Sequence, residues 1–267
     1  MDDASSPFRV VRRSAAYWRV TFDAPPINLV TFGTFAALGE LVDRMDADED
    51  VKVVVFDSAD PDFFLAHFDL VPPKEPYAGP TWLDVATRMA RSRVLTIASI
   101  RGRARGVGNE FLLACDMRFA SKEKAVLGQP EVGAGITPGG GATERLPRLV
   151  GRARALEIIT TADDFDAETA ERYGWINRAL PDAELDAHVE RVATRIASFG
   201  RKPLAEVKAL INRSTLPSED DLTAGQDTFR ASLTWPEAQE RIRQLLQRGM
   251  QQRGDLEYRL GEHIADR

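Results

Sequence analysis

The sequence lacks the features that are typical of disulfide-bonded, membrane-spanning and secreted proteins. Its single cysteine, Cys115, cannot form a disulfide within the chain, which fits a reducing compartment. No apolar run is long enough to span a membrane, and the polar start at Met1–Ser6 leads into no apolar signal segment. We therefore expect a soluble, cytoplasmic protein without a membrane-spanning segment, whose first residues are frayed.

Signals for nucleic acids, metals and nucleotides are also missing. The chain carries 35 basic and 41 acidic residues, a net charge of −6, so it lacks the basic surplus that nucleic-acid binding favours. His67 and Asp69 lie close in the sequence but have no third ligand nearby, so no metal site is expected. The glycine run that ends at Gly141 lacks the lysine of a phosphate-binding loop, and no G-x-S-x-G serine motif occurs.

What the sequence does contain is an alternation of strand and helix patterns. Two short runs, Phe8–Val11 and Tyr17–Phe22, predict a hairpin. Apolar residues at helical spacing predict a helix from Thr31 to Met45, and the apolar run Val51–Phe56 predicts a strand buried on both faces. Strand–helix–strand at this spacing predicts crossover units, and a hydrophobic content of 43% allows a sizeable α/β core.

The stretch Ile100–Asp116 is the most informative part of the chain. The apolar run Val94–Ile100 predicts a strand, and a glycine-broken turn leads from it into a helix pattern that starts near Gly106. The first N–H groups of a helix have no internal partner and carry partial positive charge, so this turn can stabilise an oxyanion. Glu110 follows in the first helical turn, and a carboxylate at that place suits acid–base chemistry on a carbonyl compound.

This stretch resembles the pattern G-x-A-x-G-G-G-x-E-[LF]-x-x-x-C-D of the enoyl-CoA hydratase/isomerase family, the crotonase superfamily. The matching residues are Gly102, Ala104, Gly106, Gly108, Glu110, Phe111, Cys115 and Asp116, while Val107 replaces the middle glycine. The resemblance implies an α/β fold, a crotonase-like spiral of repeated ββα units with a C-terminal helical region. We expect the spiral core over residues 1–200 and helices over 201–267 that cover the core and support oligomerisation.

A second segment, Asp57–Leu70, resembles the family's F-x-A-G-x-D-[LI] motif, with His67 in place of the glycine. The resemblance implies that the backbone N–H groups of Ala66 and Val107 form an oxyanion hole for a thioester enolate. Because a β-branched residue is strained at positive φ, we expect Val107 to have negative φ and to narrow the pocket. His67 should likewise avoid the left-handed region. The resemblance also implies substrate contacts from His67, Phe68, Asp69, Leu70, Gly108 and Gly139.

The third matching segment is Gly128-Gln129-Pro130-Glu131, which resembles the family motif G-x-P-E and precedes the glycine-rich run GITPGGGATERL. In hydratases of the family this glutamate is the second catalytic carboxylate. The resemblance therefore implies hydration of a trans-2-enoyl-CoA to a 3-hydroxyacyl-CoA. Glu110 would activate the water and Glu131 would give a proton to C2. Coenzyme A would be part of the substrate, and no other cofactor is expected.

Two alternatives stay open at this point. The same carboxylates could serve double-bond isomerisation or thioester hydrolysis, and some relatives bind RNA, although the acidic net charge argues against that role.

Arg101, Arg103 and Arg105 would share one face if extended and could reach phosphates, but solvation or pairing with acidic neighbours is the reading we favour.

The last part of the chain shows helical patterns at about 183–199, 203–214, 219–232 and 236–253. Their apolar stripes predict packing on the core or on other subunits, because a stripe on a surface helix needs a partner. We therefore expect a homotrimer or a dimer of trimers.

Overall fold

Two β-sheets organise the chain, which the computed structural model describes over residues 6–71 and 76–266. Within these residues the larger sheet has the order β1 (Phe8–Ser14), β2 (Tyr17–Phe22), β3 (Val53–Ser58), β5 (Leu95–Ile100), β7 (Met117–Ser121) and β10 (Arg178–Leu180). The smaller sheet has the order β4 (Phe63–Leu65), β6 (Arg103–Arg105), β8 (Val126–Gly128) and β9 (Asp164–Asp166). Neighbouring strands are parallel except at the hairpin β1–β2 and at the pair β8–β9.

Successive turns of the chain repeat one pattern: a strand of the larger sheet, a strand of the smaller sheet, and then a helix. Strands β3 and β4 lead to α2 (Trp82–Arg91), and β5 and β6 lead to α3 (Val107–Ala114). Strands β7 and β8 lead to the short 3-10 helix η1 (Glu131–Ala134) and then to α4 (Ala142–Val150). This repetition confirms the predicted α/β spiral of ββα units.

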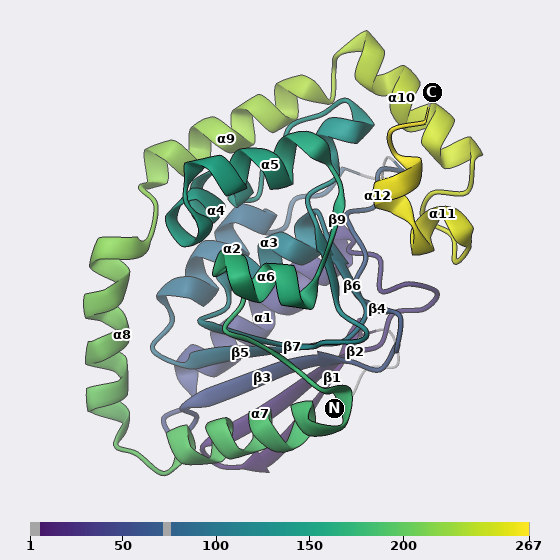
Figure 1. Ribbon diagram of the computed structural model, residues 1–267. Helices are drawn as coiled ribbons and strands as arrows, with labels where there is room; N and C mark the ends of the chain where they lie inside the picture. The colour runs from purple at the N-terminus through teal and green to yellow at the C-terminus, as the bar shows by residue number, and fades with distance from the viewer. Residues whose placement is uncertain (1–5, 72–75, 267) are drawn as a thin grey trace.

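The core lies on both faces of the larger sheet (Figure 1). One face packs against α1 (Phe32–Ala47), α2 and α3, and the other face packs against α7 (Asp182–Ala197). Strand β3 contributes side chains to both layers, since Val54 faces the first and Val55 faces the second, and both are fully buried. The prediction of a strand buried on both faces is therefore confirmed.

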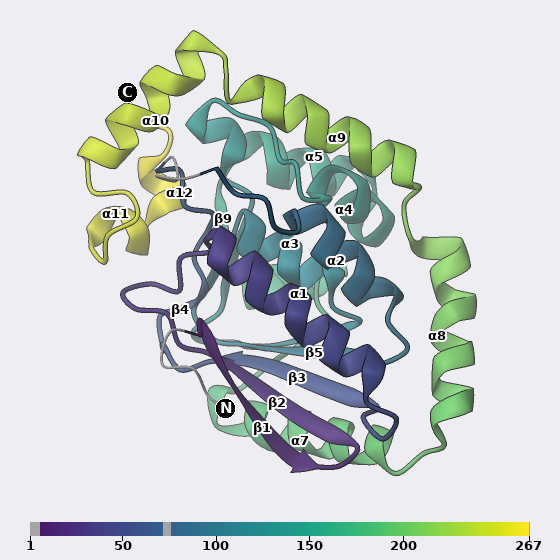
Figure 2. The same ribbon diagram turned by 180° about the vertical axis from the view of Figure 1, so that it is seen from behind.

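In the view of Figure 1 the remaining helices lie at both sides, over the top and in front of this core, and Figure 2 shows the same arrangement from behind. They are α5 (Arg152–Thr161), α6 (Ala167–Tyr173), α8 (Arg201–Thr215), α9 (Glu219–Ser232), α10 (Pro236–Gln247), α11 (Asp255–Tyr258) and α12 (Leu260–His263). The helix predicted to continue to residue 253 ends at Gln247, because Gly249 takes a left-handed φ of 101° that no helix can contain. The division at residue 200 stays a prediction.

Other expectations can be compared directly with the structure. The helix predicted from Thr31 to Met45 is α1, which Thr31 caps in a reciprocal capping box, and Thr81 caps α2 in the same way. Arg101 pairs with Asp182 at 2.7 Å and Arg105 with Asp164 at 2.7 Å, so these two arginines have the acidic partners we favoured. Residues 1–5, which we expect to be frayed, lie outside the described residues, as do residues 72–75 of the stretch 71–80, whose four prolines predict a loop. In the described chain, no helix is long and apolar enough to cross a membrane.

Candidate active site

The glycine turn before α3 has the geometry that the sequence predicts. Gly106 takes φ 52° and ψ −124°, a conformation that favours glycine, and directs the chain from β6 into the helix. Val107 is the first helical residue and is absent from the positive-φ residues, as is His67, which confirms both backbone predictions. Within the described chain, the Val107 N–H has no hydrogen-bond acceptor, and this residue lines a cavity.

The segment after β4 corrects one predicted role. The N–H of Ala66 donates to the carbonyl of Asn28 at 3.2 Å, and Ala66 does not line the cavity. Phe68 lies two residues further along and forms a parallel bridge with Val30. The hydrogen bonds of this bridge use the groups on either side of Phe68, so its own N–H has no acceptor in the described residues. The second free amide at the cavity is therefore that of Phe68, not that of Ala66.

Strand pairing brings these two amides to one place. Because β4 and β6 are parallel neighbours, the segments that follow them leave the smaller sheet at the same edge. The N–H of Arg105 donates to the carbonyl of Ala66 at 3.1 Å, which joins the two segments just before the free amides. Two unpaired N–H groups at one cavity are the donors that an oxyanion needs.

Glu110 projects from the first turn of α3 and is 4% exposed. Its Oε1 accepts hydrogen bonds from the backbone N–H of Gly140 at 2.7 Å and of Ala142 at 3.4 Å. A Cβ on Gly140 would stand 2.0 Å from Glu110 Oε2, so only glycine fits at this close approach. The glycine-rich run thus supplies donors to the carboxylate rather than a cradle for phosphate.

Glu131 begins η1 on the other side of the cavity, where part of its side chain stays open to the cavity space. Its Oε2 accepts a hydrogen bond from Gln129 Nε2 at 3.0 Å. Its Oε1 lies near Gly106, where a Cβ would stand 2.7 Å away. The sequence separates Glu110 and Glu131, but the fold brings both carboxylates to one cavity.

Burial raises the pKa of Glu110 to about 7. Burial also raises the pKa of Glu131, to about 8, and there the charge of Glu110 acts in the same direction. Two backbone donors and the buried guanidinium of Arg145 oppose the shift at Glu110 because they favour its charged form. At Glu131 only its own backbone N–H and the neutral amide of Gln129 oppose the shift, and no cation does so. When one proton is shared between the two groups, the surroundings place it on Glu131.

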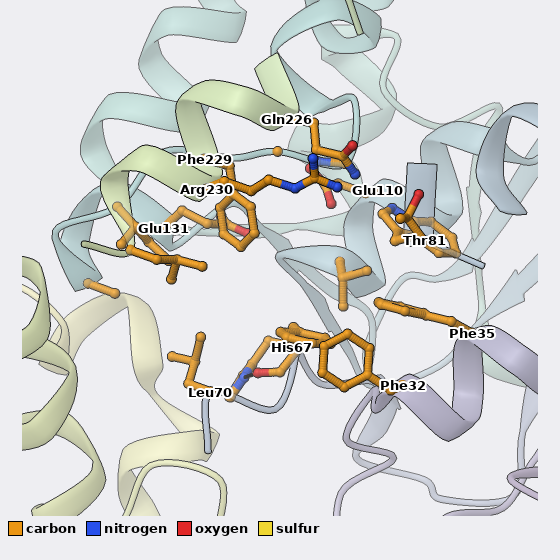
Figure 3. A pocket seen from close by; sticks show the side chains of 18 of the residues that line it. Phe32, Phe35, His67, Leu70, Thr81, Glu110, Glu131, Gln226, Phe229 and Arg230 are labelled. Atoms are coloured by element: carbon orange, nitrogen blue, oxygen red, sulfur yellow. Dashed lines mark hydrogen bonds between the residues drawn. The ribbon is translucent and has the colours of Figure 1, made fainter. Parts of the chain in front are cut away.

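The cavity between the carboxylates has a volume of about 280 Å³ (Figure 3). Of the predicted substrate-binding residues, four line it: His67, Phe68, Leu70 and Gly139. The other two do not. The Asp69 carboxylate instead accepts from the N–H of Val71 at 2.9 Å, and Gly108 lies where a Cβ would stand 2.2 Å from the carbonyl oxygen of Leu65. These two residues shape the backbone around the site.

Sequence reasoning missed the apolar walls of the cavity. One wall is aromatic and contains Phe32, Phe35, Tyr77 and Trp82. Another part of the wall comes from α9, its C-cap residue and the segment after α10, with Gln226, Phe229, Arg230, Leu233 and Met250. The residues of α9 recur at helical spacing, and this stripe was the signal that could have identified them. The helices that showed no chemistry in the sequence therefore form part of the site.

A buried ion pair ties the C-terminal helices to the segment around Phe68. His67 Nε2 lies 2.8 Å from Glu257 Oε1, and His67 Nδ1 lies 3.1 Å from the carbonyl of Phe68. Both partners are acceptors, so both ring nitrogens donate and the ring is charged. Burial alone would lower the pKa of His67, but the Glu257 carboxylate raises it above its ordinary value. The histidine that replaces the family glycine thus anchors α11 beside the free amide.

Comparison with known proteins gives a consistent result. A family model described as enoyl-CoA hydratase/isomerase matches residues 12–252. A short-chain-enoyl-CoA hydratase from Clostridium acetobutylicum is 33% identical over 201 residues, which are 73% of this chain and 77% of that protein. A crotonyl-CoA hydratase from Syntrophomonas wolfei is 45% identical over 43% of this chain and 44% of its own. The solved structure of a Streptomyces avermitilis protein has a TM-score of 0.94 and 40% identity, covering 100% of this chain and 99% of that one.

Proposed function

The chain belongs to the enoyl-CoA hydratase/isomerase family, the crotonase superfamily, and from this membership we propose that it hydrates a trans-2-enoyl-CoA to a 3-hydroxyacyl-CoA. One observation carries the proposal. Two carboxylates, Glu110 and Glu131, line the same cavity as two backbone N–H groups that have no acceptor in the described chain. This is the set of groups that addition of water across an activated double bond requires.

In the proposed reaction the thioester oxygen accepts hydrogen bonds from the N–H groups of Phe68 and Val107. Water adds to C3 while the ionised Glu110 takes its proton, and the electrons of the double bond move toward the thioester oxygen. The enolate that forms is more negative than the substrate, so the two amides stabilise it more than the ground state. Glu131 then gives its proton to C2, which completes the addition of one water.

The surroundings of the two carboxylates support these roles. Backbone donors and Arg145 favour the charged form of Glu110, which suits the base. Burial and the neighbouring charge favour the protonated form of Glu131, which suits the acid. The proposal needs coenzyme A only as part of the substrate, and no metal or other cofactor takes part in any step. The apolar walls suit the acyl group, since they remove it from water.

The experiment that tests the proposal is a hydration assay with the purified chain. Short, medium and aromatic trans-2-enoyl-CoAs are supplied, and the loss of enoyl-thioester absorbance is followed while mass spectrometry identifies the product. We expect a product heavier by one water from at least one of these substrates. Failure with all three classes contradicts the hydratase assignment. Release of a free thiol would instead identify a hydrolase, and conversion of a 3-enoyl-CoA to its 2-enoyl isomer would identify an isomerase.

A further inference from the structure

A chain of buried hydrogen bonds leads from Glu131 to a tryptophan outside the cavity. Gln129 Nε2 donates to Glu131 Oε2 at 3.0 Å, and Asn109 Nδ2 donates to Gln129 Oε1 at 2.6 Å. Trp175 Nε1 donates to Asn109 Oδ1 at 2.9 Å. The three residues beyond Glu131 are 0% exposed, and they come from the segment after β8, from α3 and from the segment before β10. Such a network is rigid only when each member is satisfied.

The direction of this chain is fixed at its far end. An indole N–H can only donate, so the atom of Asn109 that faces Trp175 must be the carbonyl oxygen. The amide nitrogen of Asn109 then faces Gln129 and must meet its oxygen. The amide nitrogen of Gln129 consequently faces Glu131. Reversing either amide would bring two donors or two acceptors together at residues that are fully buried, and each unsatisfied group there is unfavourable.

The fixed orientation of the two amides determines which carboxyl oxygen of Glu131 carries the proton. Oε2 accepts from Gln129, and a carboxyl O–H oxygen is a poorer acceptor than the C=O oxygen, so a proton on Oε2 would weaken this hydrogen bond. The carboxyl proton therefore belongs on Oε1, the oxygen near Gly106 at the start of α3. Val107, the residue after Gly106, and Glu131 itself both line the cavity. A carboxylic acid can act on a substrate only if its proton faces it.

We propose that Trp175 is a positioning residue that, acting through Asn109 and Gln129, holds the proton of Glu131 on Oε1, where it faces the cavity. The inference rests on the proposed function, in which Glu131 is the acid. Without the indole N–H, the two amides can rotate. Gln129 would then present its oxygen to Glu131 part of the time, and the proton would move to Oε2, away from the substrate.

The test replaces Trp175 by Phe, which removes the donor and keeps an aromatic ring. Trp18→Phe is the matched control, because Trp18 is also 0% exposed in the same core and its Nε1 has no acceptor in the described residues. We expect Trp175→Phe to lower kcat by about 10- to 100-fold, part of the roughly 10²–10⁴-fold that a general acid supplies, with KM nearly unchanged. Trp18→Phe should leave both constants within about twofold of the wild type, since it lies outside the positioning chain.

A second readout does not depend on turnover. Infrared difference spectra report the C=O stretching band of protonated Glu131, identified by its loss in Glu131→Gln. We expect this band to shift or split in Trp175→Phe and to stay in place in Trp18→Phe. A shifted band supports the positioning chain even if the hydration assay fails, so the two proposals can be refuted separately.

If Trp175→Phe does not fold, Asn109→Leu cuts the chain one residue closer to Glu131 with a side chain of similar size. The same loss of kcat and the same change in the infrared band are then expected. An unshifted band together with kcat equal to that of the control would overturn the proposal. Parallel losses of kcat and thermal stability without any change in the band would also overturn it, because they indicate a purely structural tryptophan.

Discussion

The two carboxylates of the cavity differ in what holds them. Glu110 accepts from the backbone N–H groups of Gly140 and Ala142, donors that no side-chain replacement removes. Glu131 accepts from the side chain of Gln129, which depends in turn on Asn109. Two backbone donors and the charge of Arg145 favour the ionised form of Glu110, whereas the charge of Glu110 favours the protonated form of Glu131. The contrast suggests how one cavity keeps a base and an acid side by side at one pH.

The largest effects are expected from neutralising each carboxylate. Glu110→Gln and Glu131→Gln should each lower kcat for hydration by about 10²–10⁴-fold, because each removes one proton-transfer group, while KM changes little. Glu184→Gln is the control, since Glu184 is exposed on α7, which covers the other face of the larger sheet, and does not line the cavity. Steady-state kinetics with the best enoyl-CoA measures the effect. A fully active Glu131→Gln beside an inactive Glu110→Gln would break the comparison and favour a one-carboxylate reaction.

The next largest effect is expected on stability, from the ion pair that joins His67, beside the free amide of Phe68, to Glu257 of α11. Glu257→Gln should lower the free energy of unfolding by about 3–5 kcal/mol, because it leaves a buried charge without its partner. Burial alone would raise the pKa of Glu257, but the charge of His67 lowers it. Urea denaturation measures the loss.

The directions of the two pKa shifts define the pH range in which the ion pair stabilises the folded protein. His67 has a raised pKa, so its contribution is complete below its unfolded value of about 6.5 and is lost as the pH rises through the folded value. Glu257 has a lowered pKa, so its contribution is complete above about 4.3 and is lost as the pH falls through the folded value. The free energy of unfolding of Glu257→Gln should therefore differ most from that of the wild type between about pH 4.3 and 6.5. A constant difference across pH would contradict a charged pair.

The pH dependence of the reaction sharpens the comparison further. Glu110 must be ionised, so the rate should fall about tenfold per pH unit below the first apparent pKa of the pair. Glu131 must be protonated, so the rate should fall about tenfold per pH unit above the second. Because burial raises the pKa of both groups, the maximum should lie near neutral or slightly alkaline pH. A profile that is flat from about pH 6 to about pH 9 would contradict the acid–base pair, because both limbs of the predicted profile fall in or next to this range.

The smallest effect on kcat is expected from a substitution on α8. This helix lies far from the carboxylates, and its outer face is apolar. Val207, Leu210 and Ile211 are 56%, 61% and 55% exposed in the single chain. We propose that this face packs against another copy in a trimer or a pair of trimers. Leu210→Glu should shift the wild-type oligomer toward monomer in light scattering and change kcat by less than about twofold, while the surface substitution costs about 0.5 kcal/mol or less of chain stability. A monomeric wild type at micromolar concentration would contradict the proposal.

The parts of the fold that repeat locally could be predicted from the sequence. Helix α1 and strand β3 follow from apolar periodicity, and the turn before α3 follows from its glycines. The convergence of Glu110 and Glu131 was predictable only through the family resemblance. Nothing in the spacing of these residues says that parallel strands bring them together.

What could not be predicted depends on contacts between distant segments. The sequence motif pointed to Ala66 as a donor, but the carbonyl of Asn28 occupies that amide and leaves the amide of Phe68 free. The partner of His67 is Glu257, 190 positions away, in a short helix that the periodicity did not indicate. The stripe of α9 indicates that Phe229 packs against something, but only the path of α9 over the spiral places it at the cavity.

The central claim is that Glu131 holds a proton while Glu110 is charged at the same pH. The most direct measurement is a titration of the side-chain carboxyl carbons of ¹³C-labelled glutamate by NMR, with Glu110→Gln and Glu131→Gln used to assign the two signals. We predict that near neutral pH the Glu131 signal is that of a carboxylic acid and the Glu110 signal that of a carboxylate. In Glu110→Gln the apparent pKa of Glu131 should fall, because the neighbouring charge is gone. Two ionised carboxylates at neutral pH, or the proton on Glu110, would contradict the account.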